Sequence, residues 1–417
     1  MPPPRPSLSA FLSTARKALL TPAAQRPTPL TFVVGNESAD LDSLCSAVLL
    51  AYFRTHAPPH RTLHIPLSNL PRADLALRPE LEAVLAPAGL QPSDLLTLTE
   101  LPGPEDLRAA DTRWVLVDHN ALTGGLAARF RDRVVGCVDH HDEEGQVPED
   151  CGDEPRVVRR AGSCMSLVVE HVRHTWRRMA DDAAGSGSGD CKPGEEEEEE
   201  LDAQLARVAL GPILIDTVCL RDGGKTTGTD VRSAEFAEGF LLPAAGTAAG
   251  YDRGLYFDEI VRLKEDISGL GYRDVLRKDY KRWDEGELRL GMSSVLRGFA
   301  YLAEQTGTKQ EFLDAMRSWA REQGLDILAL MTVEHPGGQL KRELLVWALS
   351  EKAKGAAEVF AQQNREQLQL DQWQGGKLDD TDGQDGWRKC WVQGRADHSR
   401  KQVGPMLRRA MKDSSKL

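Results

Sequence analysis

Short apolar runs alternate with helical patterns in the first half of the chain. The runs cover Leu30–Val34, Thr62–Ile65, Trp114–Val117 and Val134–Val138. Between them, stretches such as Leu44–Phe53 carry apolar residues at helical spacing. Short buried strands that alternate with helices are typical of βαβ units, so this pattern predicts an α/β domain with a mostly parallel sheet.

The second half follows a different order. A Pro-, Ala- and Gly-rich stretch at 242–250 precedes a helical region, Phe257–Trp283, and three apolar runs at 288–295, 327–333 and 344–349. This order favours an α+β domain with antiparallel strands in a mixed sheet. A chain of 417 residues also exceeds one ordinary core. We therefore expect two domains, residues 1–242 and a smaller one at 251–417.

Composition predicts the character of two segments, an insert at 183–200 and the N-terminus. Residues 183–200 are rich in Gly and Ser and end in six glutamates, which predicts a disordered, solvated insert. The N-terminal segment has no acidic residue before Glu37, as in mitochondrial transit peptides. Its residues Leu8, Leu12 and Leu19 can share one helix face, which favours a first helix of the folded domain. We expect a cytoplasmic protein, with the mitochondrial matrix as the alternative.

Charge and cysteine usage exclude several classes of protein. The net charge of −12 argues against a general polyanion binder, and no aromatic residues are interleaved with basic ones for base stacking. No apolar run has the length of a membrane span. The seven cysteines are scattered and form no CxxC pair, which argues against a disulfide framework or a structural zinc site. We expect a monomer without nucleic-acid or membrane partners.

Acids and imidazoles follow three of the apolar runs, at 30–34, 114–117 and 134–138, and a further short run at 213–215. They are Asp40 and Asp42, Asp118, His140 and His141, and Asp216. Ligands bind beyond the carboxyl ends of parallel strands, and divalent cations that act on phosphates take oxygen and imidazole ligands. A single Asp after a strand is usually a turn or helix cap. Four such positions along the chain, each with an acid or an imidazole after an apolar run, predict metal-dependent phosphate chemistry instead.

Five motifs that contain or adjoin these residues resemble those of a known family. They are GNESADLDS (35–43), VDHN (117–120), DHH (139–141), GSC (162–164) and IDT (215–217), and they resemble the DHH phosphoesterase family. In the second half, RKDYK (277–281) and SRKQ (399–402) resemble the DHHA2 domain. This domain accompanies the DHH module in family II inorganic pyrophosphatases and fungal-type exopolyphosphatases. The resemblance covers residues 28–410 or so.

The resemblance implies a set of roles. The family's metal ligands fall on Asp40, Asp42, Asp118, His140 and Asp216, with Asp118 bridging two ions, and its proton-donating histidine falls on His141. Asn36 stands where the pyrophosphatases have a metal-binding histidine. An amide is a weaker ligand for transition metals. Asn36 therefore favours the exopolyphosphatase branch, with two Mg²⁺ or Mn²⁺ ions and Co²⁺ as a further option.

The same resemblance implies a phosphate grip in the second domain. The residues it marks as substrate contacts are Lys278, Lys281, Ser399, Arg400 and Lys401; for the first two, a solvated helix face is the alternative. Arg408, Arg409 and Lys412 could extend the grip along a longer chain. The implied enzyme is an exopolyphosphatase that removes the terminal phosphate of inorganic polyphosphate with a water activated by two metals, in a cleft between the domains. The alternatives are an inorganic pyrophosphatase, a short-chain or nucleotide phosphodiesterase, and a non-catalytic phosphate-binding regulator.

Overall fold

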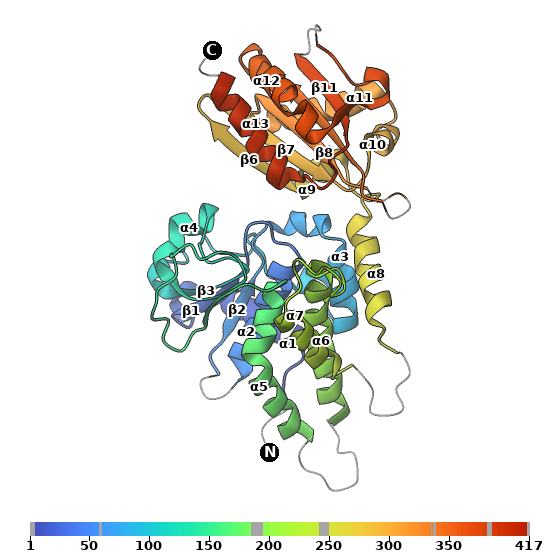
Figure 1. The fold of residues 1–417 in the computed structure, drawn as a ribbon. Coiled ribbons are helices and arrows are strands. Elements are labelled where there is room, and N and C mark those ends of the chain that lie inside the picture. The colour runs from blue at the N-terminus through green and yellow to red at the C-terminus, as the bar shows by residue number, and fades with distance from the viewer. Residues whose placement is uncertain are drawn as a thin grey trace. The chain divides into compact units, whose positions relative to one another are not determined.

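The computed structural model describes residues 5–57, 61–184, 195–241, 250–334, 336, 339–381 and 386–414. The chain forms two compact units, Met1–Asp266 and Ile267–Leu417 (Figure 1). The predicted boundary stretch, apart from Gly250, lies outside the described residues. The helix that follows it, α8 (Arg253–Glu265), belongs to the first unit. No helix in the described ranges combines the length and the apolar character that a bilayer span requires.

The first unit is built on a five-stranded parallel sheet in the order β2-β1-β3-β4-β5. Its strands are β1 (Leu30–Val34), β2 (His64–Leu67), β3 (Thr112–Val117), β4 (Val134–Asp139) and β5 (Arg156–Val158). The predicted parallel sheet is confirmed. Because all the strands run the same way, the residues after β1, β3 and β4 meet at one edge.

Helices surround this sheet and share one hydrophobic core with it. They are α1 (Leu8–Leu20), α2 (Leu41–His56), α3 (Glu80–Leu85), α4 (Gly124–Phe130), α5 (Cys164–Ala184), α6 (Glu195–Asp216), α7 (Gly228–Glu238) and α8. The first of them buries the predicted apolar face, including Leu8, Leu12 and Leu19. The N-terminal segment described here is therefore a helix of the folded domain.

The glutamate run corrects one prediction. Residues 195–200 form the first turns of α6 rather than a disordered insert, whereas 185–194 lie outside the described residues. Negative charge is favourable near a helix N-terminus. In addition, the half-buried Arg5 lies between Glu198 and Asp202, and its guanidinium donates to Asp202 Oδ1 at 2.8 Å. A partner nearly two hundred residues away thus stabilises a segment whose composition indicated a loop.

The second unit is built on a six-stranded mixed sheet in the order β10-β11-β9-β8-β7-β6. Its strands are β6 (Tyr280–Glu285), β7 (Leu288–Val295), β8 (Ile327–Thr332), β9 (Arg342–Ala348), β10 (Leu370–Gln372) and β11 (Trp387–Gln393). Strands β7 and β8 pair in parallel and the other described pairs are antiparallel. The predicted mixed sheet is confirmed.

Helices cover both faces of the second sheet (Figure 1). On one face pack α12 (Glu351–Leu368) and α13 (Arg400–Ser414), and on the other α9 (Tyr272–Lys278), α10 (Phe299–Gln305) and α11 (Lys309–Gln323). The predicted helix through Trp283 is wrong after Lys278. Residues 280–285 instead form β6, because Gly286 takes the left-handed turn (φ 60°) that pairs this segment with β7.

Candidate metal centre

Asp118 lies at the centre of the site, at the end of β3. The residue is 3% exposed, and its backbone adopts a left-handed conformation with φ 62°. Oδ2 accepts a hydrogen bond from Ser43 Oγ at 2.7 Å, on the first turn of α2. Gly35 allows this approach, because an added Cβ there would lie 2.5 Å from Ser43 Cβ. Burial, followed by the negative charge of Asp42, raises the pKa of Asp118.

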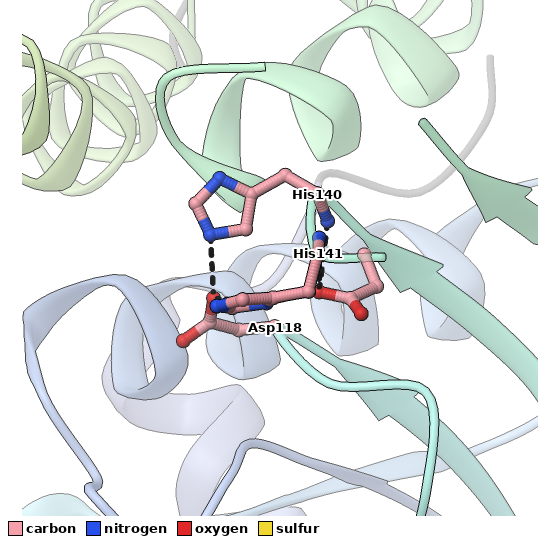
Figure 2. A group of neighbouring side chains, drawn as sticks. Asp118, His140 and His141 are labelled. Atoms are coloured by element: carbon pink, nitrogen blue, oxygen red, sulfur yellow. Dashed lines mark hydrogen bonds and ion pairs between the residues drawn. The ribbon is translucent and has the colours of Figure 1, made fainter. Parts of the chain in front are cut away.

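His140 faces Asp118 from the end of β4 (Figure 2). Its Nδ1 lies 3.1 Å from the carbonyl oxygen of Ala161 and its Nε2 lies 3.1 Å from Asp118 Oδ1. A carbonyl only accepts, so Nδ1 carries a hydrogen and the neutral ring presents the Nε2 lone pair to the carboxylate. Two acceptors at that distance need a positive charge between them. Without a metal, a proton supplies it: burial lowers the pKa of His140, but the hydrogen bond with Asp118 outweighs burial and raises it to about 9.

These donors fit a divalent cation. A metal-ligating histidine usually donates the N–H of its other ring nitrogen to a carbonyl or carboxylate, as His140 does to Ala161. One ligand atom from each of Asp118, Asp139, His140 and His141 lies within 4.8 Å of the others. These four residues form two pairs, His140 with Asp118 and His141 with Asp139.

His141 has a different environment from His140. Its Nδ1 lies 2.8 Å from Oδ1 of the buried Asp139, and 56% of its side chain is exposed. Asp139 also accepts from the backbone N–H of His140 at 2.8 Å and from Asn120 Nδ2 at 2.6 Å. The hydrogen bond with Asp139 raises the pKa of His141. Asp139 therefore orients His141 and favours its protonated form, with Nε2 left for a substrate.

Asp139 and Asn120 were not among the predicted site residues. Both belong to the motifs DHH and VDHN, which were the available signal. Their contact joins the ends of β3 and β4, so only the folded sheet reveals it.

The other predicted metal ligands lie around the start of α2 and the end of α6. Asp42 is buried, and its oxygens accept from Ser163 Oγ at 2.9 Å and from the N–H groups of Cys164 (2.6 Å) and Met165 (2.9 Å) at the start of α5. Asp40 is exposed at the N-cap of α2. Asp216 ends α6, and burial, followed by the charges of Asp42 and Asp40, raises its pKa well above the usual value. The carboxylates of Asp40, Asp42 and Asp216 therefore lie close enough to repel one another, and a bound cation would offset this repulsion.

Comparison with known proteins identifies the family. The model described as "DHH family, N-terminal domain" matches residues 31–210, and the model described as "DHHA2 domain" matches residues 258–410. This chain contains a DHH domain followed by a DHHA2 domain. The predicted resemblance is confirmed, and the sheet that carries Asp118 and His140 is the core of the DHH domain.

Several relatives have names that refer to phosphate hydrolysis. A Schizosaccharomyces pombe protein named "Putative exopolyphosphatase" is 29% identical over 97% of this chain and 98% of its own length. The human "Exopolyphosphatase PRUNE1" is 26% identical over 75% of this chain, and the match spans 61% of the human protein. A "Manganese-dependent inorganic pyrophosphatase" of Methanocaldococcus jannaschii is 22% identical over 73% of this chain and 83% of its own length. The manganese in this last name agrees with a divalent metal cofactor.

Asn36 presents a donor, not an acceptor, to the DHH site. Its Oδ1 accepts the backbone N–H of Ser38 at 2.8 Å, which fixes the orientation of the amide. Its Nδ2 then donates to Asp118, at 2.8 Å to Oδ2 and 3.0 Å to the backbone oxygen. In this arrangement Asn36 holds Asp118 in place, and its own oxygen is directed to Ser38 instead of to the carboxylates.

The predicted phosphate grip of the DHHA2 domain is divided between three elements. Lys278 ends α9, the exposed Lys281 lies on the edge strand β6, and Ser399, Arg400 and Lys401 lie at the start of α13. The guanidinium of Arg400 donates to the backbone oxygen and to Oδ1 of Asp279, both at 2.6 Å. Arg400 is therefore held beside the RKDYK segment, which brings the two motifs of this domain together.

The more distal basic residues have partners within the DHHA2 domain. Arg408 and Lys412 both pair with Glu285 on β6, at 2.5 Å and 3.1 Å. These ion pairs account for two of the three positive charges that could have extended the grip. The extension of the grip along α13 stays a prediction, in which Arg408 and Lys412 would exchange Glu285 for phosphate oxygens.

Proposed function

We propose that this protein is an exopolyphosphatase that releases the terminal phosphate of inorganic polyphosphate. The observation that carries the proposal is the pair of adjacent histidines with opposite roles. His140 directs Nε2, a ligand atom for a cation, to Asp118, whereas Asp139 holds His141 in position to give a proton. The names of the relatives support phosphoanhydride hydrolysis as the reaction.

The proposed roles follow from these contacts. Two divalent ions held by Asp40, Asp42, Asp118, His140 and Asp216 would activate the attacking water and neutralise the phosphoryl oxygens. His141 donates a proton to the leaving phosphate oxygen, because its exposed Nε2 is the free nitrogen of a ring fixed through Nδ1. Lys278, Lys281, Ser399, Arg400 and Lys401 contact the phosphates. The enzyme acts as a monomer in the cytoplasm, with the matrix as the alternative compartment.

Pyrophosphate hydrolysis is the second candidate, since one relative carries that name. A phosphate-release assay with Mg²⁺ and with Mn²⁺ tests both candidates on pyrophosphate, tripolyphosphate, long polyphosphate and a cyclic nucleotide. We expect the highest kcat/KM on polyphosphates of three or more units. Pyrophosphate as the best substrate would contradict the exopolyphosphatase proposal, and release from none of them would favour a non-catalytic role.

Asn36 offers a test of the metal preference. We expect Asn36→His to bind Mn²⁺ more tightly than the parent, because imidazole is a better ligand for transition metals than an amide. The substitution replaces the group that now donates to Asp118. Calorimetric titration of Mn²⁺ measures the change, and Asn36→Ala is the control that removes the amide without adding a ligand. Equal affinities for the histidine variant and the parent would show that residue 36 does not contact the ion.

A further inference from the structure

Two exposed cations lie on adjoining loops of the first unit and have no role in the site described above. Arg160 follows β5, and Lys225 lies between α6 and α7. The guanidinium of Arg160 donates to the backbone oxygen of Gly224 at 3.0 Å. Gly224 directly precedes Lys225, so this contact brings the two positive charges onto one small surface.

The two loops are locked together. The buried Asp230 accepts from the N–H of Gly162 at 3.0 Å and 2.9 Å, and from the N–H and Oγ1 of Thr227, each at 2.7 Å. Gly162 also packs closely on Thr217, where an added Cβ would lie 2.7 Å from Cγ2. The backbone of the loop that carries Arg160 is therefore fixed to the start of α7.

The same loops carry the metal centre. Ala161, next to Arg160, supplies the carbonyl that holds His140 Nδ1 at 3.1 Å. Thr217, which packs on Gly162, directly follows Asp216 in the chain. Arg160 therefore lies next to the residue that holds His140, and Lys225 lies on the loop that begins after Asp216.

Asp222 lies on the same loop as Lys225, but its Oδ1 accepts the backbone N–H groups of Gly224 at 2.9 Å and Lys225 at 3.2 Å, and no ion pair joins it to either cation among the described residues. Neighbouring Arg159 and Arg232 both pair with Glu170, the latter at 3.3 Å. In contrast, neither Arg160 nor Lys225 forms an ion pair with any described residue. Two adjacent like charges repel each other, and a ligand with several negative charges would reverse that effect.

We infer that Arg160 and Lys225 form a subsite for the non-terminal phosphates of a polyphosphate chain. The inference rests on the proposed function, because it assumes that the terminal phosphate reacts at the neighbouring metal centre. A guanidinium matches two phosphate oxygens and an ammonium adds a point charge, so together they suit consecutive phosphates. The subsite would favour chains longer than pyrophosphate.

The test compares Arg160→Gln/Lys225→Gln with a control of equal charge change, Lys17→Gln/Arg178→Gln. Lys17 and Arg178 are exposed on α1 and α5, away from both loops. We expect the first variant to raise KM for long polyphosphate about ten- to hundredfold and to flatten its salt dependence. Its pyrophosphate kinetics, and all kinetics of the control, should stay within about twofold of the parent.

Each outcome decides the inference. No change with long polyphosphate, or equal changes for long polyphosphate and pyrophosphate, would overturn it. If the parent protein hydrolyses no polyphosphate, the proposed function fails, and calorimetric titration of long polyphosphate into the parent and the variant then decides the subsite. Weaker binding by the variant alone would uphold the subsite as a binding site, and equal binding would reject it. Matched thermal unfolding curves establish that both variants fold.

Discussion

Asp118→Asn is expected to lower turnover by at least ~10³-fold while the fold stays intact. Loss of a bridging ligand removes several kcal/mol of transition-state stabilisation, at about 1.36 kcal/mol for each tenfold in rate. Asparagine is a better test than alanine, because it tolerates the left-handed backbone at φ 62°. Its oxygen can still accept from Ser43 and Asn36, while its Nδ2 can donate to the lone pair of His140.

The same substitution should stabilise the metal-free protein. Because the folded state raises the pKa of Asp118, ionisation of this buried carboxyl opposes folding. The penalty is absent below the ordinary aspartate pKa and grows as the pH rises through the folded-state value of about 7. Protonated His140 offsets part of this penalty up to its own pKa of about 9, so we expect a higher Tm for Asp118→Asn than for the parent above pH 9 in the presence of a chelator.

Phosphate release at saturating Mg²⁺ and thermal unfolding measure these two effects. Asp142→Asn is the matched control, since it makes the same charge change at an exposed position of the loop after β4. Near-normal turnover of Asp118→Asn with saturating metal would contradict the bridging role.

His141→Gln is expected to lower kcat by about 10²- to 10⁴-fold, the usual contribution of a general acid. Affinity for the metal should change little, because His141 directs Nδ1 to Asp139 and not to Asp118, whose Oδ1 is 3.9 Å away. Metal titration by calorimetry and steady-state kinetics separate the two effects. A large loss of metal affinity would make His141 a ligand instead of an acid.

The pH profile gives a sharper test through Asp139→Asn. An acid works in its protonated form, so the rate falls as the pH rises through the pKa of His141. The hydrogen bond with Asp139 raises that pKa, and asparagine removes the charge that favours the imidazolium. We therefore expect the alkaline limb of kcat to move to lower pH in Asp139→Asn. An unmoved limb would mean that another group supplies the proton.

The sequence by itself determined the strands and helices whose burial shows as a run or a period of apolar residues. Apolar runs such as Leu30–Val34 and Val134–Val138 predict strands because every side chain in them must leave water, and the structure places them in the parallel sheet. The motifs at their ends predicted that acids and imidazoles would gather there, and the structure brings Asp118 and His140 together.

Only the tertiary structure decided which polar groups pair. Arg5 contacts Glu198, 193 residues away, and so stabilises the glutamate run as part of α6. Glu285 forms ion pairs with Arg408 and Lys412 on α13. The hydrogen bond that Asn36 Nδ2 donates likewise needs the carboxylate of Asp118, 82 residues away. Hydrophobic burial is non-directional and leaves a periodic trace in the sequence, whereas a hydrogen bond or an ion pair needs one partner at one distance and angle. In the folded chain that partner comes from a distant segment, and the local sequence pattern around either residue does not indicate it.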